Sequence, residues 1–116
     1  MRTIWLGALL ASAVVSHAAQ AACVEPQAGA QAAPAFSPPL AQVVTGAGRL
    51  QFYSAPNGQC AVKGVFVIPN DRLIAYAQTQ DGWSSVMYLN PRTGGDVSGW
   101  VRSARLKTVG TVGPKQ

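Results

Sequence analysis

The sequence has few residues suited to acid–base catalysis or metal binding. Its 116 residues include one histidine, His17, and four acidic residues. A Ser–His or Cys–His catalytic pair needs an imidazole, and so do many metal sites. His17 lies in an N-terminal stretch that we expect to be removed, and the acidic residues are scattered rather than paired. We therefore predict a protein without enzymatic activity, cofactor or metal.

Long hydrophobic runs are also scarce. Residues 4–15 form one apolar run of about a dozen residues, shorter than the ~20 that span a bilayer. Arg2 precedes the run, and the small residues at positions 19 and 21 suit signal peptidase. We predict that residues 1–21 are a signal peptide and that the mature protein is periplasmic or secreted. An uncleaved membrane anchor and a lipoprotein lipidated at Cys23 are the two alternatives.

Cysteine is limited to Cys23 and Cys60. An even number of cysteines in an exported chain predicts a disulfide rather than free thiols. Closing a loop of this length stabilises the fold by roughly 4 kcal/mol on the loop-entropy model. Two cysteines without a histidine give little support to a metal site.

Acidic residues are fewer than basic residues. Nine Lys and Arg residues stand against four Asp and Glu, for a formal net charge of +5. The anions available to an exported protein are wall peptides, lipid head groups and acidic protein surfaces, so nucleic acid is not expected as a partner. We expect membrane association only if Cys23 is lipidated.

The chain changes character near residue 48. Residues 22–47 are rich in Ala, Gln, Gly and Pro, and four prolines disfavour a helix or a central strand. We interpret this segment as a partly extended linker tethered by the disulfide. Residues 48–108 are predicted to form the folded domain, and residues 109–116 a flexible tail.

The predicted domain consists of short β-type runs separated by turn signals, with no helical period. Leu50 and Phe52 alternate with Tyr53, which indicates a strand with one buried face. The predicted strands are 50–54, 65–68 (a run of the fully buried type), 73–79, 83–89 and 99–102, with a short terminal turn and strand at 103–107. About five strands in an all-β chain of this size predict a small antiparallel barrel.

Four motifs follow one another in this domain. They are FYSAP (52–56), NDRLIAY (70–76), GWSSV (82–86) and GWV (99–101). In this order and at this spacing, residues 49–107 resemble the bacterial SH3 (SH3b, SH3-like) domains of exported proteins. The resemblance implies an SH3-like barrel in which Trp83 borders a ligand groove and Trp100 packs inside.

The resemblance also implies a ligand surface. Tyr53, Trp83 and Tyr88 would form its apolar part, and Arg102 and Arg105 its cationic edge. SH3 domains that bind proline-rich peptides usually have Pro and Tyr at the positions of these two arginines. They also have an acidic loop where this chain has GQCAVK. The surface is therefore expected to suit an anionic, partly apolar ligand.

Two kinds of partner fit a small exported binding module. One is an envelope protein, including an exported hydrolase or toxin that the module inhibits, with the loop 90–96 entering the active-site cleft. The other is a peptidoglycan stem peptide, whose carboxylates would meet the arginines. In that alternative the protein is an accessory of the cell envelope without an inhibitory role.

Overall fold

The computed structural model describes residues 23–113, which form seven β-strands and one short 3-10 turn, η1 (Ser103–Arg105). The strands are β1 (Ala35–Val44), β2 (Leu50–Tyr53), β3 (Ala61–Val67), β4 (Arg72–Gln78), β5 (Trp83–Leu89), β6 (Asp96–Arg102) and β7 (Leu106–Thr111). The prediction of an all-β fold is confirmed, and residues 23–113 contain no α-helix. The predicted signal peptide lies outside the described residues.

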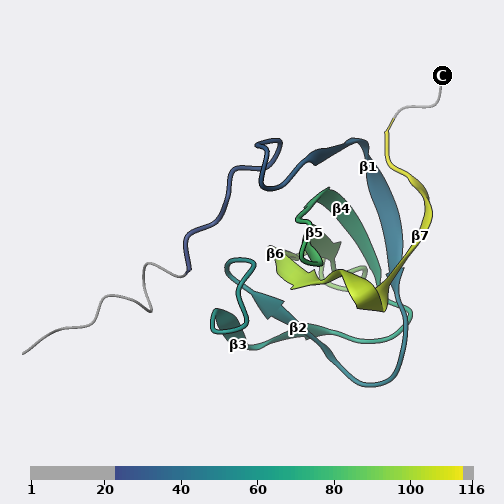
Figure 1. Ribbon diagram of the computed structural model, residues 1–116. Helices are drawn as coiled ribbons and strands as arrows, with labels where there is room; N and C mark the ends of the chain where they lie inside the picture. The colour runs from purple at the N-terminus through teal and green to yellow at the C-terminus, as the bar shows by residue number, and fades with distance from the viewer. Residues whose placement is uncertain (1–22, 114–116) are drawn as a thin grey trace, which may run out of the picture.

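All seven strands belong to one antiparallel sheet with the order β3-β2-β6-β5-β4-β1-β7. The expected count of about five strands is wrong, because β1 falls in the segment interpreted as a linker. The sheet is not closed by strand pairing, since β3 and β7 are its two edges. Figure 1 shows β1 beside β7 on one side of the curled sheet and β2 beside β3 on another.

β1 corrects the interpretation of residues 22–47 as a partly extended linker. Ala35–Val44 pairs with β4 on one side and with β7 on the other. Its two consecutive prolines lie where the register against β4 shifts, between Ala35 and Leu40. Regular hydrogen bonding between strands is interrupted at a bulge, so a bulge can contain proline, which has no backbone N–H to donate. Clustering of the prolines in one irregular stretch thus leaves the rest of β1 free to pair.

The predicted flexible tail, residues 109–116, is likewise partly in the sheet. β7 extends to Thr111 and pairs with β1, with Leu40 opposite Thr111 and Val44 opposite Leu106. The N–H of Val112 continues the contact by donating to the carbonyl of Pro39. Residues 114–116 lie outside the described part of the chain.

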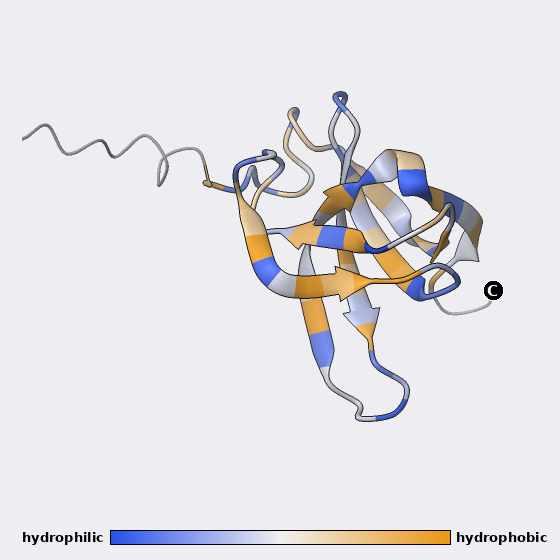
Figure 2. Cartoon of the chain, turned by 90° about the horizontal axis from the view of Figure 1, so that it is seen from below, coloured by the Kyte–Doolittle hydropathy of each residue, from blue (hydrophilic) through white to orange (hydrophobic). Residues whose placement is uncertain are grey.

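Alternating residues of the strands meet in one interior, the aliphatic cluster. Its buried members are Val44, Leu50, Phe52, Val67, Leu73, Ala75, Val86 and Val101. Val67 of the edge strand β3 and Val44 of β1 can share this cluster only because the sheet curls on itself. Figure 2 shows hydrophobic residues along the strands, and burial of such side chains is the main stabilising contribution to folding.

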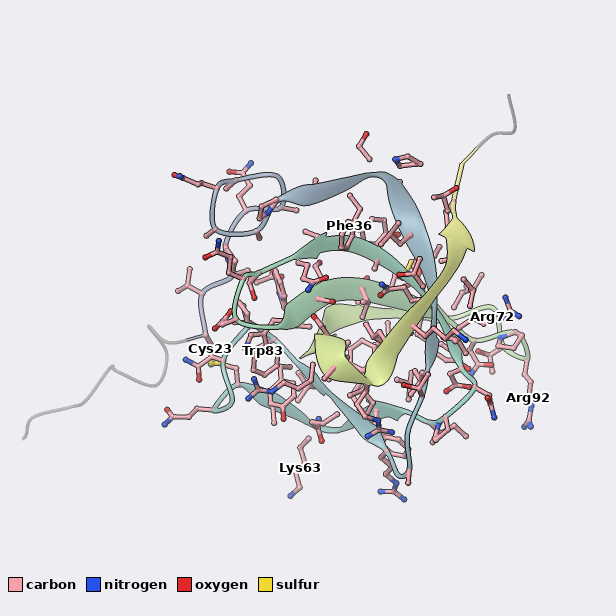
Figure 3. All side chains as sticks on the ribbon, turned by 45° about the vertical axis from the view of Figure 1, so that its right-hand side comes forward. Cys23, Phe36, Lys63, Arg72, Trp83 and Arg92 are labelled. Atoms are coloured by element: carbon pink, nitrogen blue, oxygen red, sulfur yellow. A yellow bond between two sulfur atoms is a disulfide. The ribbon has the colours of Figure 1, made fainter. Side chains whose placement is uncertain are left out.

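A second, smaller group of buried residues forms the tryptophan cluster, made of Ala33, Ala77, Trp83 and Trp100. Ala33 comes from residues 23–34, which we call the N-terminal strap. The strap is linked to the domain by the Cys23–Cys60 disulfide, which confirms that prediction. Figure 3 shows Cys23 and Trp83 on one side of the molecule and Arg92 on the opposite side.

One hydrogen bond also joins the strap to the tryptophan cluster. Trp100 is 1% exposed, and its indole Nε1–H donates to Oε1 of Glu25 at 2.8 Å. A buried indole N–H without an acceptor would lose the hydrogen bond that it makes to water in the unfolded chain. The strap therefore supplies an apolar contact, a polar contact and a covalent bond to the same end of the sheet.

Candidate binding groove

A groove opens between β3 and the hairpin formed by β5 and β6. Its volume is about 420 Å³, and it is lined by Gly64, Val65 and Phe66 of β3, by Tyr88 and Val97 of the hairpin strands, and by the turn between those strands. Ligand sites are typically concave, mainly apolar and roughly 300–1,000 Å³ in volume. The groove falls within that range and is the candidate site.

The groove continues the interior of the sheet beyond the aliphatic cluster. Successive side chains of a strand point to opposite faces, so Val97 shares a face with the core residue Val101. Tyr88 lies opposite Val97, shares a face with the core residue Val86, and packs against the cluster. Val97 nevertheless keeps 36% of its surface exposed. An apolar face of the interior is therefore left open at this end of the hairpin.

The opening begins where β2 stops covering β6. The two strands pair at Tyr53 and Trp100. A Cβ on the neighbouring Gly99 would lie 2.9 Å from the carbonyl oxygen of Tyr53 and 3.0 Å from Cδ2 of Phe52. Glycine permits this approach because it has no side chain. From Gly99 towards the hairpin turn, β6 has β5 as its strand partner.

The turn of the hairpin is held by its own hydrogen bonds. Oδ1 of Asn90 accepts from the N–H of Arg92 at 2.9 Å, and the carbonyl of Asn90 accepts from Gly94 at 2.9 Å. The N–H of Gly95 donates to Oγ1 of Thr93 at 3.1 Å. Asparagine favours such turns because its side chain can bond to the backbone two residues on. The turn therefore gives the groove a wall of defined shape.

The wall formed by β3 includes an aromatic ring that has a cation beside it. Phe66 is 37% exposed, and Cζ of Arg49 lies 4.2 Å from its ring centroid, which is cation–π geometry. The interpretation of residues 65–68 as a fully buried run is wrong for Phe66 and Ile68. Val67 points into the core, whereas Phe66 lies on the exposed face of the edge strand β3 and Ile68 is exposed just after the end of that strand.

Three of the predicted site residues come together away from this groove. The rings of Tyr53 and Trp83 meet edge to face, with centroids 4.7 Å apart. Cζ of Arg102 lies 3.8 Å from the centroid of the Trp83 ring. Trp83 is 2% exposed because it lies under these neighbours and in the tryptophan cluster. Its ring is packed and is not an open surface; Trp100 is packed as predicted.

The other two predicted site residues are separate from that group. Arg105 is occupied with the loop between β1 and β2, where its guanidinium donates to the carbonyls of Thr45, Gly48 and Arg49. It therefore holds a loop rather than forming a free cationic edge. Tyr88 lies towards the turn end of β5, whereas Trp83 begins that strand. Of the five predicted site residues, Tyr88 is the one that lines the groove.

Sequence reasoning missed most of the groove. Val65, Phe66 and Val97 are ordinary β-strand residues, and no motif distinguishes them. The one available signal was the uninterrupted apolar run 65–68. If such a run lies at the edge of a sheet, only alternate side chains are buried, and the large side chains of Phe66 and Ile68 stay exposed.

Residues 23–113 contain no group of three or more His, Cys, Asp or Glu placed to hold a metal ion. Within the same residues, no helix has the length and hydrophobicity needed to cross a membrane. Comparison of the chain with protein-family models, curated proteins and solved structures finds no match.

Proposed function

We propose that the mature protein is a non-enzymatic, SH3-like binding module of the periplasm or the secreted fraction, and that its groove binds a segment of a partner protein. The observation that carries the proposal is an apolar interior face, at Tyr88 and Val97, that is left open in a groove of about 420 Å³. Exposed apolar surface of this kind is typical of sites that a ligand covers.

One further feature supports an exported module. The Cys23–Cys60 disulfide is consistent with an oxidising compartment. It also engages the sulfur that lipidation would need, which favours the soluble form over the lipoprotein. One partner protein that fits is an exported hydrolase or toxin that the module inhibits. The hairpin turn 90–95 borders the groove and is held by its own hydrogen bonds, so it could enter the active-site cleft of such a partner.

A wall-binding accessory role is the second candidate. It is favoured by the exposed cations Lys63, Arg72 and Arg92, which suit the carboxylates of peptidoglycan stem peptides. Figure 3 shows these three side chains in different parts of the molecule, with Lys63 well separated from the other two. They do not converge on one site, so the groove is the stronger basis for a function.

The proposal is tested by placing a charge in the groove. Val97→Glu puts a carboxylate among its apolar walls, and Leu89→Glu is the matched control. Leu89 is 53% exposed and belongs to the same hairpin, but it borders a different depression beside Asn70 and Pro91. The wild type and both variants are immobilised and incubated with a periplasmic extract and, separately, with purified peptidoglycan sacculi.

We expect a partner protein to be retained by the wild type and by Leu89→Glu, and to be lost with Val97→Glu. Quantitative mass spectrometry of the retained proteins measures the difference. Retention of sacculi alone, with equal strength by all three proteins, would instead favour the wall-binding role. A partner protein that binds Val97→Glu as well as the wild type would refute the groove as its site.

A further inference from the structure

The hydrogen-bond pattern of the β5–β6 hairpin shows which backbone groups of β6 point towards the groove. In an antiparallel ladder, opposed residues alternate between pairs that exchange hydrogen bonds and pairs that do not. The N–H of Asn90 donates to the carbonyl of Gly95 at 2.9 Å, next to the turn. At the other end of the hairpin, the N–H of Ser103 donates to the carbonyl of Gly82 at 2.8 Å. The register between these two points is continuous.

Counting along the ladder from either end gives the same result. Val97 belongs to a pair that exchanges hydrogen bonds with β5, whereas Asp96, Ser98 and Trp100 direct their N–H and C=O groups away from β5. Trp100 uses this side to pair with Tyr53 of β2. On the same side, no strand of the described part of the chain pairs with Asp96 or Ser98. Two residues of β6 therefore present backbone donors and acceptors beside the groove.

We infer that the partner segment adds to β6 as an extended strand along residues 96–98. The inference rests on the proposed function and specifies how the groove is used. A strand added there pairs with the backbone of Asp96 and Ser98. Its residue opposite Val97 lies on the Val97 face, because directly opposed residues share a face of a sheet. That residue therefore enters the groove between Val65 and Tyr88 and must be apolar.

A cation next to one of the lining residues specifies the partner further. The guanidinium of Arg49 lies over the ring of Phe66, which lines the groove. None of the acidic residues in the described part of the chain forms an ion pair with Arg49. A carboxylate on the added strand can supply the missing charge. The partner segment is thus extended, with an apolar side chain for the groove and an acidic residue near it.

The outer edge of β3 is less suited to this role. The register between β2 and β3 shifts between Gln51 and Tyr53, and Gly64 in this part of β3 has a φ of +79°. The side-chain amide of Gln51 fills the irregularity by donating to the carbonyls of Val62 and Val65. β3 therefore has a bulge and an exposed lysine, Lys63. Both features commonly prevent another strand from pairing with the edge of a sheet.

The test uses a phage-displayed library of random nonapeptides as the probe, selected on the mature protein. Ser98→Pro removes one N–H that points away from β5 and leaves the β5–β6 ladder intact, so the variant is expected to fold. Ser98→Ala keeps the N–H and is the matched control. Circular dichroism and urea unfolding check both folds. Titration of the selected peptides measures their affinities.

We expect the selected peptides to carry apolar and acidic residues and to bind Ser98→Pro at least tenfold more weakly than Ser98→Ala. N-methylation of successive peptide residues should weaken binding at every second position only, because alternate N–H groups of a strand face β6. Arg49→Gln should weaken binding at low salt, while Arg72→Gln, in β4, should not.

The outcomes separate the inference from the proposed function. Peptides that lose binding to Val97→Glu but bind Ser98→Pro normally would uphold the groove and refute strand addition. Peptides indifferent to Val97→Glu would refute both. If the library yields no peptide that prefers the wild type over Ser98→Pro, or if N-methylation shows no alternation, strand addition is wrong.

Discussion

The two clusters of buried residues differ in how they are built. The aliphatic cluster is formed by alternate residues of six strands, β1 to β6. The tryptophan cluster is formed at one end of β5 and β6 and is completed by the N-terminal strap, through Ala33, Glu25 and the disulfide. The first depends on many similar apolar contacts, whereas the second depends on a few contacts of different kinds. Their sensitivity to substitution should differ accordingly.

The largest effect is expected in the aliphatic cluster. Phe52 is 1% exposed, and Phe52→Ala would leave a cavity among residues from several strands. Buried Phe→Ala substitutions cost about 3–5 kcal/mol. We expect a loss of about 4 kcal/mol in the free energy of unfolding, measured by urea titration. Phe66→Ala, at a ring that is 37% exposed, is the control and should cost less than about 1 kcal/mol. Similar losses for both would contradict a core centred on the aliphatic cluster.

A smaller effect is expected when the strap is released from its covalent bond. Replacing Cys23 and Cys60 together by serine should lower the free energy of unfolding by about 3 kcal/mol, because the unfolded chain gains freedom. This is less than the roughly 4 kcal/mol of the loop-entropy model, because an unfolded chain retains some structure. The strands should remain, since the aliphatic cluster contains no strap residue. Far-ultraviolet circular dichroism checks the strands, and quenching of tryptophan fluorescence checks whether Trp100 becomes accessible. A variant with unchanged stability and unchanged quenching would show that the strap is held without the disulfide.

The smallest effect concerns one hydrogen bond of the strap. Glu25→Ala leaves the buried indole N–H of Trp100 without its acceptor and should cost about 1 kcal/mol. Glu25→Gln keeps a carbonyl oxygen and should recover most of the loss. Gln27→Ala, at an exposed position of the strap, should change little. Urea titration of all three variants distinguishes the contribution of this hydrogen bond from a general effect of substitution in the strap. Equal stability of Glu25→Ala and Gln27→Ala would show that the bond does not stabilise the fold.

The same contrast explains what could be predicted from the sequence. The strand at 83–89 was predicted with the bounds that the structure has, and the strand at 73–79 differs by one residue at each end. These strands have clear alternation and clear turns beside them. β1 has neither, since it contains consecutive prolines and its partners lie far away in the sequence. Local patterns carry no information about such partners, so β1 was missed.

The candidate site was predicted least well, for a related reason. Trp83 was singled out by its motif, but its exposure depends on Arg102, on Tyr53 and on how the strap closes the cluster. The groove depends on where β2 ends its cover of β6, at Gly99. Both are properties of the assembled sheet. Residue type indicated that an aromatic surface exists, and only the packing of the strands shows which part of it is open.

The place of β1 in the sheet has a consequence for the order in which the chain folds. Within residues 23–113, β1 is the first strand, yet one of its two neighbours is β7, the last strand of that range. Val44 pairs with Leu106, and Leu40 pairs with Thr111. Contacts between residues so distant in sequence form slowly, because a long loop must close before they stabilise the chain. The sheet is therefore completed late in folding, because β1 acquires its second neighbour only when the long segment between β1 and β7 has brought the two strands together.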